Sequence, residues 1–166
     1  AHIDHTGKIP ALVAQGYRGP IYATEATRQL CSIMLRDSAH IQESEAQWHS
    51  RKALRAGDPP VEPTYTLADA MGTIKLLRPC RYLEPIQVAE GIVIRMNDIG
   101  HLLGSASVII TATEGDVTKK IVFSGDVGNT NQPLINDPQK ITDTDYLVIE
   151  STYGNRLHEK ARGDAV

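Results

Sequence analysis

The chain has 166 residues, of which 41% are hydrophobic and 22% are charged, and its formal net charge is −3. This composition is typical of one globular domain, and no apolar run reaches the roughly 18 residues that a membrane span needs. The negative charge does not favour a nucleic-acid binder, which usually carries a basic stripe. Cys31 and Cys80 lack a CxxC spacing and are predicted to be buried reduced thiols, which indicates a reducing compartment, the cytoplasm.

The first part of the sequence has the apolar spacing of helices. A short amphipathic pattern around residues 9–13 is expected to end at Gly16, and residues 21–23 resemble a short strand. Thr24 is placed to cap a second helix that extends into the 40s. The buried face of that helix is predicted to carry Ala26, Leu30, Ile33 and Met34.

The continuation of this helix, at 43–55, is highly charged and is therefore expected to be mostly exposed. His40 and His49 are predicted to be solvated surface residues. The run Asp58-Pro59-Pro60 is expected to break the helix, and a further helix is predicted at 67–77.

From Arg81 onward the pattern changes to that of strands. They are predicted at 82–88, 91–97, 107–113 and 120–124, with a hairpin turn at Gly115-Asp116. The apolar run 146–149 is typical of a strand buried on both faces. Helices followed by strands indicate a layered structure of the α/β (α+β) class.

A possible metal-ligand cluster opens the chain. His2, Asp4 and His5 place two imidazoles and a carboxylate within four residues, a composition suited to metal binding. In an extended segment His2 and Asp4 would point to the same side, and a helix starting at Thr6 would bring His5 to a neighbouring position. The alternative is a polar loop with chance histidines.

Three later motifs each place a polar side chain next to a predicted strand. His101 lies between glycines just before a strand, although a lone histidine is more often structural than a ligand. Asp126 follows a strand in Ser124-Gly125-Asp126, where an ordinary turn is the alternative. Glu150 ends an apolar run and would be costly to bury without a partner, the alternatives being a helix cap or a surface ion pair.

Taken in this order, the motifs resemble the metallo-β-lactamase superfamily and, within it, the β-CASP nucleases. The signature His-x-His-x-Asp-His matches from His2 onward, with its leading histidine lying before Ala1. The later motifs match Gly100-His101, Ser124-Gly125-Asp126 and Glu150-Ser151-Thr152-Tyr153-Gly154. The resemblance extends from Ala1 to about His158.

This resemblance implies a partial metallo-β-lactamase αββα sandwich at 1–146, followed by the start of a truncated β-CASP insertion at 147–166. Such a fragment is expected to expose sheet edges and to be poorly soluble alone, because unpaired edges associate.

The resemblance also implies a site for two Zn²⁺ ions. His2 and His101, with the absent leading histidine, would hold one ion, and Asp4 and His5, with a histidine beyond Val166, would hold the other. Asp126 would bridge the two ions, and a water between them would be activated for attack on a phosphate.

The implied catalytic residues are Asp4 and Glu150. Asp4 would orient the attacking water, and Glu150 would orient a histidine from the β-CASP region that protonates the leaving oxygen. Ser151 and His158 are candidate phosphate or substrate contacts; for His158 the alternative is a capping or surface role.

The predicted function is zinc-dependent hydrolysis of RNA phosphodiester bonds, as an endonuclease or a 5′-exonuclease, with the fragment inactive alone. The alternatives are another hydrolase of the same fold, acting on a thioester, a lactone or a small phosphodiester, and a non-catalytic scaffold subunit of an RNA-processing complex. The Glu150-Ser151-Thr152-Tyr153-Gly154 segment favours the nuclease. Single-stranded RNA is the expected partner, no membrane contact is expected, and a homodimer is the candidate assembly.

Overall fold

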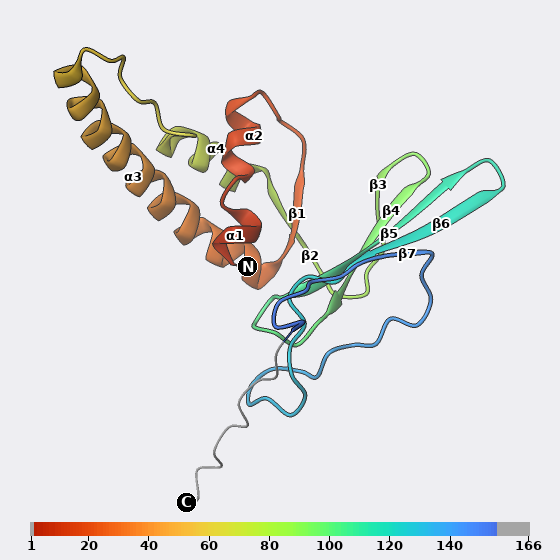
Figure 1. Ribbon diagram of the computed structural model, residues 1–166. Helices are drawn as coiled ribbons and strands as arrows, with labels where there is room; N and C mark the ends of the chain where they lie inside the picture. The colour runs from red at the N-terminus through yellow and green to blue at the C-terminus, as the bar shows by residue number, and fades with distance from the viewer. Residues whose placement is uncertain (1, 156–166) are drawn as a thin grey trace, which may run out of the picture.

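A computed structural model describes residues 2–155 of the chain, and it belongs to the mixed α/β class that the sequence predicts. Figure 1 shows a group of helices beside a five-stranded sheet, joined through a small parallel sheet of β1 (Ile21–Thr24) and β2 (Leu77–Cys80). A buried core lies within the helical part, and it consists of Ala23, Cys31, Leu35, Ala39, Tyr65, Ala70 and Leu77. None of the described helices is long and apolar enough to cross a bilayer.

The helices are α1 (Ile3–Thr6), α2 (Ile9–Ala14), α3 (Glu25–Ala56) and α4 (Leu67–Leu76). The predicted cap is confirmed, because the Thr24 side chain accepts a hydrogen bond from the Thr27 backbone N–H. The helix ends at Gly57 in the left-handed conformation, just before the predicted break. The prediction for the opening residues is corrected, because helix α1 begins at Ile3 rather than after an extended segment.

The buried face of α3 differs from the predicted one. The structure buries Cys31, Leu35, Ala39 and Ala46, whereas Ile33 is 69% exposed and Leu30 is 38% exposed. Cys31 and Leu35 lie on the face of α3 that packs against β1, β2 and α4. These three elements therefore decide which face of the helix is covered. The charged half of the helix is mostly exposed, as predicted, and so are His40 and His49. Cys31 and Cys80 are buried and free, as predicted.

The larger sheet contains β3 (Ile86–Ala89), β4 (Ile92–Asp98), β5 (Ala106–Glu114), β6 (Val117–Phe123) and β7 (Tyr146–Val148), in that spatial order. Neighbouring strands are antiparallel except β6 and β7, which run parallel. The hairpin turn predicted at Gly115-Asp116 is confirmed, since Glu114 pairs with Val117 across it.

Strand β7 is not buried on both faces as the sequence predicts. Tyr146, Leu147 and Val148 are 58%, 53% and 52% exposed, and Ile149 after them is 65% exposed. The strand pairs only with β6 and forms the sheet edge, so within residues 2–155 no neighbouring strand lies on its outer side. Strand β2 was not predicted, because its four residues become a strand only by pairing with the distant β1.

Candidate metal centre

The sheet topology brings three of the sequence motifs to one edge. Strands β4 and β6 both run antiparallel to β5, and β7 runs parallel to β6, so the carboxyl ends of β4, β6 and β7 lie at the same edge. His101 follows β4, Asp126 follows β6 and Glu150 follows β7. Residues that are separated by almost 50 positions in the sequence are therefore neighbours because of strand direction alone.

The loop that carries His101 packs on the amino end of α3. The hydroxyl groups of Thr24 and Thr27 donate hydrogen bonds to the carbonyl oxygen of Gly104, at 2.6 and 3.0 Å. Gly104 has a φ of +87°, and a Cβ at this position would lie 2.8 Å from the Cβ of Ala26. Only glycine permits this approach, so α3 holds the His101 loop at a fixed position beside the sheet.

The loops carrying His101 and Asp126 lie backbone against backbone. The Gly128 N–H donates to the carbonyl oxygen of Ile99 at 2.9 Å, and a Cβ on Gly128 would overlap the carbonyl oxygen of Gly100. The absence of a side chain at Gly128 therefore sets how closely the two loops approach.

We expect Gly128→Ala to separate these loops, lower the metal content of the protein and cost about 1–3 kcal/mol of stability, as overpacking typically does. Urea unfolding and elemental analysis of the full-length protein measure both effects. Gly72→Ala is the matched control, because a Cβ there meets only the Val13 side chain, at 3.3 Å, and alanine is favoured within a helix. Equal behaviour of the two variants would contradict the close fit of the loops.

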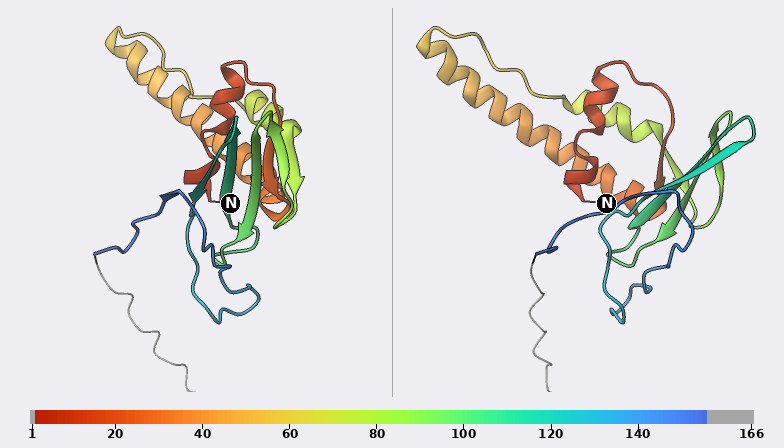
Figure 2. Two further views of the ribbon diagram at one scale, coloured as in Figure 1. Left: turned by 90° about the vertical axis from the view of Figure 1, so that its right-hand side faces the viewer. Right: turned by 45° about the vertical axis from the view of Figure 1, so that its right-hand side comes forward.

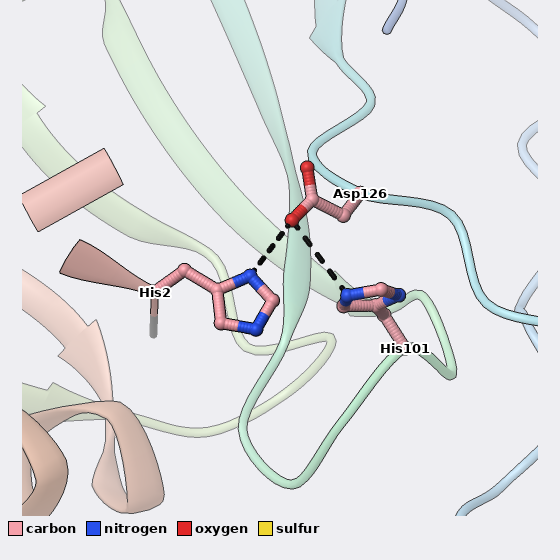
Figure 3. Close-up of side chains that lie close together, drawn as sticks. All are labelled: His2, His101 and Asp126. Atoms are coloured by element: carbon pink, nitrogen blue, oxygen red, sulfur yellow. Dashed lines mark hydrogen bonds and ion pairs between the residues drawn. The ribbon is translucent and has the colours of Figure 1, made fainter. Parts of the chain in front are cut away.

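Asp126 is the centre of the cluster, as Figure 3 shows for its contacts with His2 and His101. Its Oδ2 atom lies 3.1 Å from Nδ1 of His2 and 3.7 Å from Nε2 of His101. The two imidazole rings are 5.2 Å apart between centroids and nearly perpendicular, at 87°. Three ligand-type side chains from α1's amino end and two separate loops thus converge on one point.

The other carboxylate oxygen of Asp126 faces the rest of the opening cluster. Its Oδ1 atom lies 3.2 Å from Nε2 of His5, and the same nitrogen is 3.5 Å from Oδ2 of Asp4. Asp4 and His5 lie on the single turn of α1, which replaces the extended geometry expected from the sequence. Asp126 therefore presents one oxygen to His2 and His101 and the other to His5.

The donor atoms have the spacing of a metal site. Two groups, His2, His101 and Asp126 and also His2, Asp4 and His5, each have potential ligand atoms within 4.8 Å of one another. Donors bound to a tetrahedral Zn²⁺ at about 2.0–2.2 Å are roughly 3.3–3.6 Å apart. The observed separations of 3.1 to 3.7 Å between histidine nitrogens and carboxylate oxygens come close to this range. Imidazole and carboxylate are ligands that Zn²⁺ accepts, so the residues present fit the metal.

The cluster also favours the ionised carboxylate of Asp126. Partial burial by itself raises the pKa of this group, but the hydrogen bond with His2 and the charges of His5 and His101 outweigh it. The pKa of Asp126 therefore lies below its ordinary value, and the side chain is an anion at neutral pH.

Asp98 is a residue of the site region to which the sequence analysis assigned no role. Its carboxylate accepts hydrogen bonds from the Gly100 N–H at 3.0 Å and from the Asn136 side chain at 3.1 Å. Its backbone N–H and carbonyl group both bond to Gln139, at 3.2 and 2.9 Å. Asp98 therefore joins the His101 loop to the long segment between β6 and β7. The only signal in the sequence was an acid directly before Ile99-Gly100-His101.

A cleft of about 540 Å³ opens beside the cluster, and its lining includes Asp4, His101, Asp126, Glu150 and Thr152. Val127 follows Asp126 in the chain, and its backbone N–H donates a hydrogen bond of 2.5 Å to the Glu150 carboxylate. Ser151 is exposed and does not line the cleft among the described residues. His158 lies outside the described residues.

Comparison with known proteins gives a consistent result. Ribonuclease TTHA0252 of Thermus thermophilus is 35% identical over 162 residues, which cover 98% of this chain and 32% of that protein. An RNase J-like protein of Methanocaldococcus jannaschii is 32% identical over 161 residues, covering 96% of this chain and 32% of that protein. The transcription termination factor FttA of Methanococcus maripaludis is 32% identical over 155 residues, covering 93% and 22%. No family model matches the chain.

The fold and the site define a mixed α/β protein with a cluster of metal-ligand side chains at one edge of its sheet. The chain belongs to the metallo-β-lactamase superfamily, in its β-CASP branch, and has part of the αββα fold of that superfamily. It spans about a third or less of the length of the curated relatives it matches.

Proposed function

We propose that this chain is part of a zinc-dependent ribonuclease that hydrolyses RNA phosphodiester bonds at a dinuclear site. The observation that carries the proposal is the orientation of Asp126, which presents one carboxylate oxygen to His2 and His101 and the other to His5. A bridging carboxylate between two ions needs this arrangement. The names of two relatives, a ribonuclease and an RNase J-like protein, support RNA as the substrate.

In this proposal His2 and His101 would hold one Zn²⁺, Asp4 and His5 would hold the second, and Asp126 would contribute an oxygen to each. The remaining ligands come from outside these 166 residues, as does the histidine that protonates the leaving group. Residues 1–146 then form part of the metallo-β-lactamase domain, and 147–166 begin the β-CASP region. Two such ions, when bound, lower the pKa of a water and offset the charge on the attacked phosphate.

The side chains of the chain itself position the reactants. Asp4 is 74% exposed at the cleft, so its carboxylate is accessible to accept a hydrogen bond from the attacking water. Glu150 follows β7 and lines the same cleft, where it can orient the proton donor. Ser151 and His158 remain candidate phosphate contacts in this proposal. The buried free thiols of Cys31 and Cys80 support a cytoplasmic location.

A role in transcription termination is the second candidate, because several archaeal relatives are named transcription termination factor FttA. The intact donor set of the metal cluster does not favour a scaffold without catalysis.

The test uses the full-length protein and a single-stranded RNA labelled at either end. After treatment with a chelator we expect no cleavage, and after addition of Zn²⁺ we expect cleavage to return, with two metal ions bound per protein. The label position separates endonuclease from 5′-exonuclease products. Hydrolysis of a thioester or lactone, without any cleavage of RNA in the presence of zinc, would identify the alternative hydrolase and refute the ribonuclease.

A further inference from the structure

The charged half of α3 carries a stripe of four side chains that the metal centre does not use. Trp48, Arg51, Lys52 and Arg55 follow one another at intervals of three, one and three residues, so they share one face of the helix. All four are exposed, and together they line a hollow of about 520 Å³. These four residues are called the α3 stripe below.

The aromatic member of the α3 stripe is exposed to solvent. Trp48 is the only tryptophan of the chain, and its side chain is 54% exposed. An indole gains more free energy from burial than most side chains, so an exposed one is available to a partner. Lys52 Nζ lies 5.8 Å from the indole centroid, and the ring of His49 contacts the indole edge-on at 4.7 Å. The indole is thus held beside a cation rather than packed into a core.

The cations of the α3 stripe are available as well. Among residues 2–155, no ion pair involves Arg51, Lys52 or Arg55, whereas Arg28 near the start of α3 is paired with Glu25 at 2.6 Å. The sequence has no acidic residue between Glu45 and Asp58. A compact positive patch on a chain with a formal net charge of −3 is a local feature and does not follow from overall composition.

We propose that the α3 stripe binds single-stranded RNA at a distance from the metal centre, a proposal that takes RNA from the proposed function above. The three cations would bind successive phosphates, and the indole would stack on a base. Cations that follow the backbone and an aromatic ring that stacks on bases are the combination by which proteins bind single strands without reading sequence. The stripe would therefore retain long substrates irrespective of sequence.

The geometry sets the length of RNA that this surface can influence. The amino end of α3 packs on the His101 loop, and Figures 1 and 2 show the other end of α3 extending away from the five-stranded sheet. At 1.5 Å per residue, Trp48 lies about 35 Å along the helix from Glu25. A stacked strand that rises about 3.4 Å per nucleotide needs roughly ten nucleotides to span this distance. A stacked RNA shorter than this cannot reach from the metal centre to the α3 stripe.

The binding test uses the full-length protein, a chelator to prevent cleavage, and a fluorescent unstructured RNA of about 20 nucleotides, well above the length just derived. We expect Trp48→Ala to weaken binding about tenfold and Trp48→Phe to retain most of the affinity, because phenylalanine still stacks. Arg51→Ala should also weaken binding. The slope of the logarithm of the binding constant against the logarithm of the salt concentration should become shallower by about 0.7, which is the contribution of one phosphate contact on a single strand. Arg36→Ala is the matched control, since Arg36 is exposed on another face of the same helix.

The cleavage test separates substrate retention from chemistry. For the long RNA, Trp48→Ala should raise KM and leave kcat unchanged, whereas an RNA of about six nucleotides, too short to span the distance above, should be cleaved with wild-type kcat/KM. Circular dichroism verifies that the variants keep their helix.

Wild-type RNA affinity of both Trp48→Ala and Arg51→Ala would overturn the proposal. So would unchanged RNA affinity accompanied by altered sedimentation, which would assign the stripe to contacts between copies of the protein. If the wild type binds RNA through the stripe but cleaves none, the proposed function fails and the stripe proposal stands.

Discussion

Asp126→Ala is expected to remove the bound metal and to lower RNA cleavage by about a thousandfold or more, the equivalent of roughly 4 kcal/mol of transition-state stabilisation. The reason is geometric, because this one side chain approaches His2 and His101 through one oxygen and His5 through the other. Elemental analysis and cleavage of a labelled RNA under saturating conditions measure the two effects.

Two further variants sharpen this experiment. Asp126→Asn preserves the size of the side chain but has only one oxygen and no charge, so we expect partial metal binding and a large loss of cleavage. Asp116→Ala makes the same chemical change in the exposed β5–β6 hairpin turn, at the end of β6 opposite to the one that Asp126 follows, and should behave as the wild type. Full metal content and activity in Asp126→Ala would contradict the bridging arrangement.

Glu150→Ala is expected to lower both metal affinity and cleavage by about 10–100-fold, the usual cost of losing a group that orients a metal ligand. The Glu150 carboxylate accepts a hydrogen bond from the Val127 N–H, and the Glu150 N–H donates to the Ser124 hydroxyl at 3.0 Å. Glu150 therefore secures the loop of Asp126 on both sides. Titration of the metal-free protein with Zn²⁺ and the cleavage assay give the two quantities.

Glu150→Gln separates this positioning role from the proposed role in orienting a proton donor. Glutamine retains an oxygen that can accept from the Val127 N–H, so metal affinity should return to within a few-fold of the wild type. If cleavage stays low while metal binding is restored, the carboxylate charge acts on the proton donor. Wild-type metal affinity in Glu150→Ala would refute the positioning role.

The proposed cleavage step and the proposed retention of long RNA depend on different parts of the chain. The metal cluster lies at the edge of the sheet, whereas the α3 stripe lies on the distant half of a 32-residue helix. Because their contributions are expected to be independent, Asp126 variants should change kcat and α3 stripe variants should change KM for long RNA.

The sequence by itself determined the features that depend on neighbouring residues. The cap at Thr24, the end of α3 before Asp58-Pro59-Pro60, and the hairpin turn at Gly115-Asp116 are local conformational preferences, and the structure has all three. The same holds for the order of the motifs around His2, His101 and Asp126, since each is a short run of residues that can be recognised without its partners.

Only the tertiary structure decided which surfaces are covered and which loops meet. Helix α3 has apolar side chains on two faces. The elements that pack against the helix determine that the face with Cys31 and Leu35 is the covered one. An apolar run such as Tyr146–Val148 reads as buried although it forms an edge strand. The hydrogen bond that the Asn136 side chain donates to Asp98 and the fit of Gly128 against Gly100 link segments that are distant in sequence. Strand directions and long-range packing set these contacts, and neither is encoded in the spacing of nearby residues.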